Sequence, residues 1–441
     1  MRPESAIGPP AVSFLVATRT RASLPTSPLR TAGTLFALWL MVFTAASQTI
    51  LVTPILPLIA VELGVPVGEL GPLVSVYSVV LALAALVMGP VSDRIGRKRV
   101  MVIGSGVLAL LLLGHGLADT YPRLLAARVL AGAGGGMLSG AAVSYVGDAF
   151  PYARRGWATG WVMSGVPFGL VLGIPVGRIL AVGLGFRAPF VSFAAVMAVA
   201  FALVLLVVPQ PDVERTERPT VGGALRLYGD LLRRPGPAMA ALLYFVMYAG
   251  LGLLIVYLPA WLTDRFSLAV SLGGQPLTVG GLPVDFIALL FFAGGLASVL
   301  VGPRAGALSD RLGRKPLVLA SSVGLTVLAA LVPFVLAERW MAVVLYVVLM
   351  SLFAMRMAPF QALLTALVPA FERGAFLSLT IAVGQIGTAL GATLGGLLYG
   401  RFGFTANALA SAATMALMAA LVYSHFPEAV EEGDVEPALP C

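Results

Sequence analysis

The chain has 441 residues, of which 59% are hydrophobic and only 11% are charged. Soluble domains carry about 25% charged residues, so this composition excludes an ordinary soluble protein. The net charge of +8 would suit a nucleic-acid partner, but its distribution along the chain gives it another meaning.

Twelve apolar segments are long enough to cross a bilayer, for which ~20 residues suffice. They are 33–61, 70–91, 100–118, 122–147, 157–181, 187–208, 237–261, 284–305, 316–337, 340–369, 375–399 and 404–425. With a cytoplasmic N-terminus, 20 of the 28 Lys and Arg residues fall on the cytoplasmic side, six on the opposite side and two inside spans. This bias predicts a multi-pass protein of the cell membrane with both termini cytoplasmic, and it accounts for the charge without nucleic acid.

The two ends of the chain are polar. Residues 1–32 hold four arginines among Pro, Ser and Thr, and we expect a disordered cytoplasmic tail without a cleavable signal peptide. Residues 427–441 form a second, acidic tail that contains the only cysteine, Cys441. An intrachain disulfide is therefore excluded.

Two prolines stand near the outer end of the first span. Pro54 and Pro57 follow Gln48, the one amide side chain of that span. Proline removes a helix hydrogen bond, so a simple kink is one interpretation of this pair. A role in transport is the other.

The first strongly basic motif lies between the second and third spans, from Gly89 to Lys98 (GPVSDRIGRK). Asp93 would end a helix, where the helix dipole disfavours a carboxylate, so we expect it to face the N-terminus of another helix. Gly89 would permit close helix contact, and Gly96 would permit a tight turn. The candidate gating residues here are Gly89, Asp93, Arg94, Gly96, Arg97 and Lys98.

The fourth span contains an arginine, Arg128, six residues inside the membrane and followed by Gly132. A charge at this depth is costly unless it faces a cavity or polar partners. Snorkelling of the side chain to the outer interface is the alternative. His115 in the third span could titrate near neutrality, although a lone histidine there is more often a packing residue.

The fifth span has glycines at every fourth position, followed by a proline. Such a stripe lets two helix backbones approach closely, so plain helix packing is one interpretation and a transport role the other. The residues are Gly165, Gly169, Gly173, Pro175 and Gly177.

The only long polar connection, residues 209–236, separates two six-span halves. Leu225, Leu231 and Leu232 with neighbouring arginines predict a short amphipathic helix over 224–234, lying on the anionic cytoplasmic leaflet. The one sizeable outer loop, 262–283, is glycine-rich and holds no metal-ligand cluster.

The basic motif recurs 217 residues later as GALSDRLGRK, with seven of ten positions identical. Its candidate gating residues are Gly306, Asp310, Arg311, Gly313 and Arg314. The glycines of span five recur in span eleven at an offset of 218, as Gly387, Gly391 and Gly395. The sequence therefore predicts an all-α integral membrane fold, with 12 transmembrane helices in two pseudo-symmetric six-helix bundles, 33–208 and 237–426, related by a parallel repeat.

Both copies of the basic motif resemble motif A of the major facilitator superfamily, and the resemblance covers roughly residues 33–426. It implies that Asp93 faces the start of the eleventh span, Asp310 the start of the fifth, and that Arg97 pairs with Asp148 at the base of the fourth. It also implies that these clusters latch the cytoplasmic side closed.

Other motifs resemble those of exporters in the same family. The segment Arg128–Gly132 is similar to motif B, without the polar residue that the family often has at Ala131. The glycine stripe of span five and the Pro54, Pro57 pair are similar to exporter motifs, and the place of Pro175 is closer to the sugar-efflux-like branch (arabinose-efflux permeases) than to drug antiporters.

Arg356 lies near the centre of span ten, and no acidic residue occupies a span centre. An unpaired buried guanidinium is expensive, so we expect it to face an aqueous cavity between the halves. A structural arginine bonded to carbonyls at a Pro359 kink is the alternative. The candidate substrate-cavity residues are Gln48, Tyr77, Arg128, Tyr244, Tyr248, Arg356, Gln361 and Gln385.

We therefore expect a monomeric secondary transporter that moves a polar or anionic solute by proton-coupled efflux, without a cofactor. Uniport, exchange and import are alternatives, because the usual mid-membrane carboxylate is missing. A membrane-embedded enzyme would need a catalytic constellation in the spans, and a sensor would need a soluble effector domain. Neither feature is present in the sequence.

Overall fold

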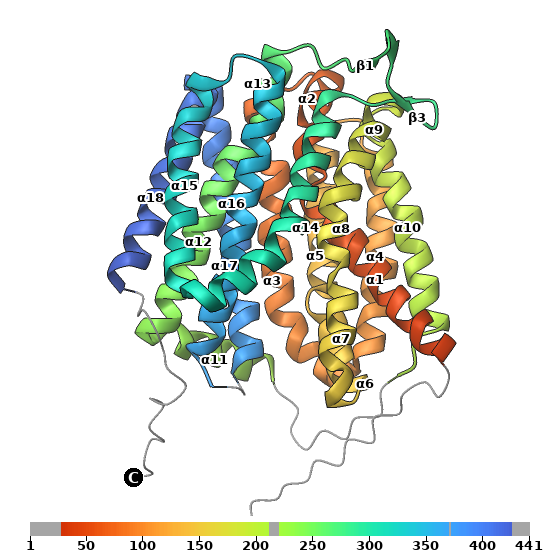
Figure 1. The fold of residues 1–441 in the computed structure, drawn as a ribbon. Helices are drawn as coiled ribbons and strands as arrows, with labels where there is room; N and C mark the ends of the chain where they lie inside the picture. Colours follow the sequence, from red (N-terminus) through yellow and green to blue (C-terminus); the bar gives the residue numbers. More distant parts are fainter. Residues whose placement is uncertain (1–27, 211–219, 370–371, 426–441) are drawn as a thin grey trace, which may run out of the picture.

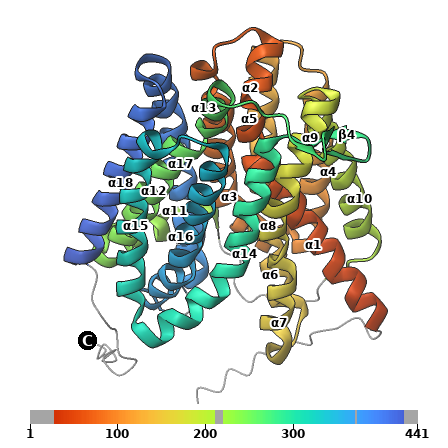
Figure 2. The ribbon, with the colours of Figure 1, turned by 45° about the horizontal axis from the view of Figure 1, so that its top comes forward.

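The computed structural model describes residues 28–210, 220–369 and 372–425. Within these ranges twelve helices are long and apolar enough to cross a membrane, which confirms the predicted all-α membrane fold. The helices form two bundles that stand side by side, one coloured red to yellow and the other green to blue in Figures 1 and 2.

The first bundle supplies six spans. Its elements are α1 (Pro28–Ile50), α2 (Val52–Leu63), the 3-10 helix η1 (Val67–Leu70), α3 (Pro72–Ile95), α4 (Arg97–Gly116), α5 (Tyr121–Leu138), α6 (Ala141–Ala149), α7 (Tyr152–Met163), α8 (Gly165–Phe168), the π-helix η2 (Gly169–Gly173), α9 (Ile174–Leu184) and α10 (Ala188–Leu206).

The second bundle follows a connecting helix, α11 (Val221–Arg233). Its elements are α12 (Pro235–Ile255), α13 (Leu258–Arg265), the short strands β1 (Ser271–Leu272), β2 (Gln275–Pro276), β3 (Thr278–Val279) and β4 (Leu282–Pro283), and then α14 (Phe286–Leu312), α15 (Arg314–Val335), α16 (Arg339–Ala366), α17 (Arg373–Phe402) and α18 (Phe404–His425). The strands pair as two antiparallel hairpins, β1 with β2 and β3 with β4.

Four spans predicted as continuous are interrupted, and the seventh of the twelve breaks between Ile255 and Leu258. The first is divided at Leu51 into α1 and α2, because Pro54 has no N–H to donate to the preceding turn, so the kink is real. The fourth is divided at Gly140, whose φ of 74° suits glycine. The fifth contains η2 directly before Pro175, where the missing N–H loosens the helix ladder.

The glycine stripes bring helices together inside each bundle. A Cβ atom on Gly165 would lie 2.9 Å from the Trp39 carbonyl oxygen of α1. In the repeated stripe of α17, a Cβ on Gly391, the counterpart of Gly173, would collide with the Ala249 carbonyl of α12. These contacts support the packing interpretation of the stripe, because a side chain larger than that of glycine at these positions would collide with the facing backbone.

The two bundles are joined mainly at one end. We call the end that carries the β-hairpins, at the top of Figure 1, the hairpin side, and the end with α11 the linker side. On the hairpin side, Ser75 Oγ of α3 donates to the Ala389 carbonyl of α17 at 2.7 Å and lies 2.7 Å from Thr393 Oγ1. On the linker side, a Cβ at Gly89 or Gly374 would meet no atom within 4 Å. The conformation is therefore closed on the hairpin side.

One predicted boundary needs correction. The tail expected at 1–32 ends earlier, because α1 begins at Pro28, and proline is well suited to the first turn of a helix. Residues 1–27 and the acidic tail at 427–441 lie outside the described residues.

The connecting helix packs on protein as well as facing outward. Leu231 is fully buried, so the expectation that it lies on the membrane surface is wrong, whereas Leu225 and Leu232 are exposed. Tyr228 Oη donates to the Leu86 carbonyl of α3 at 3.4 Å. Since α11 also packs on α12 and α17, it touches both bundles.

An ion pair anchors the end of α11 to α17. Arg234 Nη1 and Nη2 donate to the two carboxylate oxygens of Glu372 at 2.6 and 3.1 Å. These hydrogen bonds and the negative charge raise the pKa of the Arg234 guanidinium above its ordinary value. The Arg234 guanidinium therefore stays charged at physiological pH.

The glycine contacts predict a sharp positional effect on stability. Gly391→Ala should lower the thermal midpoint of the purified protein, because overpacking typically costs about 1–3 kcal/mol. Gly400→Ala in the same helix is the matched control, since its Cβ would meet no atom within 4 Å. The measurement is thermal unfolding of both variants in one detergent, and equal midpoints would contradict the packing role.

Candidate functional site

The first basic motif is built around a tight turn and an ion pair. Gly96 adopts φ of 99° between α3 and α4, and Gly313 adopts φ of 92° at the same place in the second copy, as predicted. Arg97 Nε donates to Asp148 Oδ2 of α6 at 3.2 Å, so the expected pairing is confirmed. This pair fixes α4 to the base of the fourth span.

Other expectations for this motif have mixed outcomes. The side chains of Asp93 and Asp310 lie outside the described ones, so their helix partners stay predictions. Close helix contact at Gly89 is wrong for this conformation, because the space around it is empty. The remaining motif positions are surface or half-buried residues, namely Arg94, Lys98, Gly306, Arg311 and Arg314.

A polar cluster in the first bundle joins α1, α3 and α5. Arg128 is fully buried, which rules out snorkelling. Its Nε and Nη1 donate to the carbonyls of Leu73 and Gln48 at 3.0 and 3.3 Å, and its guanidinium carbon lies 4.0 Å from the centre of the Tyr77 ring. Gly132 lets α5 approach the Tyr77 backbone. The cluster is thus a cation held by carbonyls and an aromatic face.

This cluster has spare hydrogen-bonding capacity. Among the described residues, neither the side-chain amide of Gln48 nor Nη2 of Arg128 has a hydrogen-bond partner, and both are buried. Buried polar groups are usually paired, so such groups are candidates for contact with a ligand or water. His115 instead stacks on Phe190 at 4.4 Å, in agreement with a packing role.

A second polar cluster lies in the other bundle, on α12, α16 and α18. Tyr244 stacks on Tyr248 at 5.6 Å and on Phe360 at 5.4 Å. Gln361 Nε2 donates to Tyr244 Oη at 3.5 Å. The structure thus brings together four predicted cavity residues, because Arg356 borders the same aromatic group through the Phe353 ring, 5.1 Å from its guanidinium carbon.

Arg356 itself does not face an aqueous cavity in this conformation, contrary to prediction. Its exposed fraction is 1%, and Nη1 contacts the sulfur atoms of Met415 and Met418 on α18 at 3.2 and 3.4 Å. The alternative of bonds to carbonyls at the Pro359 kink is not seen either, and Nε has no partner among the described residues. Sulfur is a weak acceptor, so this cation is poorly compensated.

The two clusters stay in separate bundles. Gln385 of α17, the remaining predicted cavity residue, is half-buried, and its Oε1 has no hydrogen-bond partner in the described ranges. Its neighbour Gly384 lies against the rings of Tyr244 and Tyr248. A solute that contacts both clusters would therefore bridge the two bundles.

One polar contact was missed by sequence reasoning. Arg178 of α9 and Asp285, which precedes α14, form a buried ion pair between the bundles, with Nη2–Oδ2 at 2.6 Å. Each residue looks like an ordinary span-end charge in the sequence, and 107 residues separate them. The sequence signal was a cation near the outer end of span five and an anion at the outer start of span eight.

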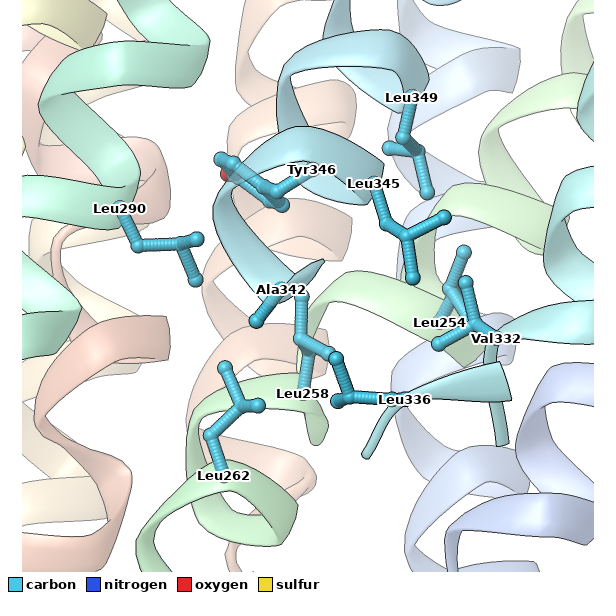
Figure 3. Close-up of a pocket in the computed structure, with 10 residues that line it drawn as sticks. All are labelled: Leu254, Leu258, Leu262, Leu290, Val332, Leu336, Ala342, Leu345, Tyr346 and Leu349. Carbon is cyan, nitrogen blue, oxygen red and sulfur yellow. The ribbon is translucent and has the colours of Figure 1, made fainter. Parts of the chain in front are cut away.

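The structure also contains an apolar pocket of about 360 Å³ in the second bundle (Figure 3). Leucines of α12, α13, α14 and α16 line it together with Tyr346 and Val332. Its lining residues are apolar apart from the Tyr346 hydroxyl, and none of them belongs to either polar cluster.

Comparison with known proteins identifies the family. The sequence profile of the Major Facilitator Superfamily matches residues 38–284 and 240–439. The chain belongs to this superfamily, so it is a membrane transporter with twelve spans and not an enzyme.

Curated relatives and a solved structure agree with this assignment. The "Uncharacterized MFS-type transporter YbcL" of Bacillus subtilis (strain 168) is 24% identical over 82% of this chain and 88% of its own. "Multidrug resistance protein MdtG" of Proteus mirabilis (strain HI4320) is 25% identical over 84% and 90%. The crystal structure of a D-xylose-proton symporter, 16% identical, superimposes with a TM-score of 0.72 over 91% of this chain and 99% of the symporter, which shows a shared fold.

The poorly compensated arginine gives a prediction that separates stability from transport. Replacing a buried ion by an apolar residue of similar volume is often neutral or stabilising. We expect Arg356→Met to keep the thermal midpoint or raise it, and to reduce transport by about tenfold or more, the loss expected for a missing charged contact with the solute.

Arg356→Lys and Met415→Leu complete this test. Lysine keeps the charge without the planar fork and should also lose transport, whereas Met415→Leu removes one sulfur contact and leaves the cation in place. Thermal unfolding and solute flux are measured on the same preparations. Full transport by Arg356→Met would remove Arg356 from the site.

Proposed function

We propose that this transporter exports a small polar or anionic solute from the cytoplasm by alternating access, with the proton gradient as its energy source. A single chain holds both bundles, and we propose a monomer as the working unit. The observation that carries the proposal is closure between the bundles at the hairpin side, with an incompletely satisfied polar cluster inside each bundle.

The direction of transport rests on membrane orientation. The excess of Lys and Arg on the linker side supports a cytoplasmic position for that side and for both termini. A state closed on the hairpin side would then accept solute from the cytoplasm. The relatives named multidrug resistance proteins favour the outward direction.

The substrate class follows from the charges in the two clusters. Arg128 and Arg356 each place a guanidinium in the membrane, and neither has a carboxylate partner among the described residues. A second cation brought there would meet repulsion at low dielectric, whereas an anion or a hydroxyl-rich solute would supply the missing acceptors. This argument separates the proposal from export of lipophilic cations.

Exchange or uniport is the second candidate for energy coupling. Of the carboxylates in the described residues, Asp285 is buried between the bundles and is already paired with Arg178. Its carboxylate oxygens already accept from the Arg178 guanidinium and the Ala288 N–H, so both are occupied in this conformation. This observation favours a mechanism in which one solute exchanges for another.

Transport is tested with inside-out vesicles that contain the purified chain. The probes are a radiolabelled sugar acid, a neutral sugar and tetraphenylphosphonium. We expect uptake of the acid or the sugar above empty vesicles, and none of the cation. Uptake of tetraphenylphosphonium alone would contradict the substrate class.

Proton coupling is tested in the same vesicles with an imposed pH gradient. We expect uptake to fall to the control level when an ionophore collapses the gradient. Uptake that is indifferent to the ionophore, but stimulated by unlabelled solute inside the vesicles, would establish exchange in place of proton coupling.

The basic motif provides an inactive variant. The resemblance to motif A implies that Asp93 helps to close the cytoplasmic side, so Asp93→Asn should lose transport while its abundance in the membrane is retained. Immunoblotting of membranes and solute flux are compared with the parent chain. Full transport by this variant would contradict the latch role of the motif.

A further inference from the structure

A buried ion pair joins the two bundles at the hairpin side. Arg178 donates to Asp285 Oδ2 through Nε at 2.8 Å and through Nη2 at 2.6 Å. The exposed fractions of the two side chains are 2% and 9%. A pair this dry interacts more strongly than one in water and is screened little by salt.

The remaining hydrogen-bonding groups of the pair are also used. Arg178 Nη1 donates to the Pro54 carbonyl of α2 at 2.6 Å. Asp285 Oδ1 accepts from the Ala288 N–H at 3.0 Å and so caps the N-terminus of α14, where the helix dipole favours a carboxylate. The pair therefore ties α2 and α9 of one bundle to the start of α14 in the other.

The hairpin loop that precedes Asp285 packs on the same seam. Leu282 of β4 lies against Gly183 of α9, where an added Cβ would come within 2.7 Å of it. Arg339, at the start of α16, holds the loop by donating to the carbonyls of Ser267 and Ala269 at 3.2 and 3.0 Å. The loop thus belongs rigidly to the second bundle and covers an element of the first.

The ion pair has no charged counterpart at the repeat-related positions. The offset of 218 between spans five and eleven takes Arg178 to Gly396, and the offset of 217 between the two basic motifs takes Gly68 to Asp285. Gly68 and Gly396 also touch each other across the bundles, since a Cβ on Gly68 would lie 3.0 Å from the Gly396 carbonyl oxygen. We call the Gly68–Gly396 contact the glycine seam. The repeat-related Arg178–Asp285 contact is the charged seam.

We propose that Arg178 and Asp285 form the latch of the outer gate: they hold the hairpin side closed, and their separation and hydration is the step that exposes the solute site to the outside. The proposal deepens the alternating-access function and rests on it for its place in the transport cycle. The glycine seam then separates together with the charged seam, and the ion pair sets the equilibrium between the closed and open states.

The latch is tested by cysteine accessibility, which needs neither a substrate nor transport. Cys441→Ser removes the native thiol, and Ser75→Cys places a reporter in the other seam, where the parent side chain is 8% exposed. A membrane-impermeant maleimide is added to the outer side of intact cells. Asp285→Asn keeps an oxygen that can cap α14 but loses the charge, and we expect it to label about tenfold faster, within the range of typical coupling between sites.

Three further variants make the outcome decisive. Arg178→Gln should label as fast as Asp285→Asn, and the double variant should label no faster than the faster single one, because either change alone removes the pair. The matched control is Glu62→Gln, which breaks the exposed Glu62–Arg187 pair on the same side but within the first bundle, and it should label like the parent. Unchanged labelling in Asp285→Asn, or equal acceleration in Glu62→Gln, would overturn the proposal.

A disulfide across the seam tests the latch if the charge variants fail to fold. Gly183→Cys with Leu282→Cys, in the Cys441→Ser background, places two thiols across the seam. After oxidation we expect the Ser75→Cys reporter to be protected from label and solute flux to stop, with both restored by reductant. Labelling that continues in the oxidised protein would overturn the latch, whereas protection without any measurable flux in the reduced protein would point to failure of the proposed transport function alone.

Discussion

Burial of three guanidinium groups inside a bilayer is the constraint on which this structure depends. Hydrocarbon offers no hydrogen bonds, so each cation must find its partners within the protein. Arg128 uses helix carbonyls and a tyrosine face, Arg178 uses a carboxylate, and Arg356 contacts sulfur atoms and a phenyl ring among the described residues. Compensation is therefore graded: Arg178 is fully paired and joins the bundles, Arg128 keeps an unpartnered Nη2, and Arg356 has the weakest acceptors.

The repeat supplies the scaffold, and departures from it supply the function. Glycine stripes in spans five and eleven pack in the same way against α1 and α12, so the two bundles share their internal architecture. Arg178 and Asp285 replace what are glycines at the equivalent positions, and Arg356 corresponds to Leu138. Both seams lie on the hairpin side, and the charged one adds an ion pair that the glycine seam lacks.

The sequence predicted the fold well because span length, charge bias and an internal repeat are local or periodic signals. The Arg97–Asp148 pair and the turns at Gly96 and Gly313 were predicted from the resemblance of the motif. The partners of Arg356 and the Arg178–Asp285 pair were not, because they depend on helix rotation and on which spans touch across the bundles. Hydropathy also misses the breaks at Leu51 and Gly140, where the composition stays apolar.

The central claim is that the hairpin side and the linker side open in alternation, and distances between spin labels test it most directly. Exposed positions suit the labels: Leu117 with Phe402 across the hairpin side, and Ile95 with Leu312 across the linker side. Double electron–electron resonance is measured for both pairs over the same series of lipid and pH conditions. The account predicts two populations at each side, with the hairpin-side distance lengthening as the linker-side distance shortens. Distances that lengthen together, or a single unchanging population at the hairpin side, would contradict it.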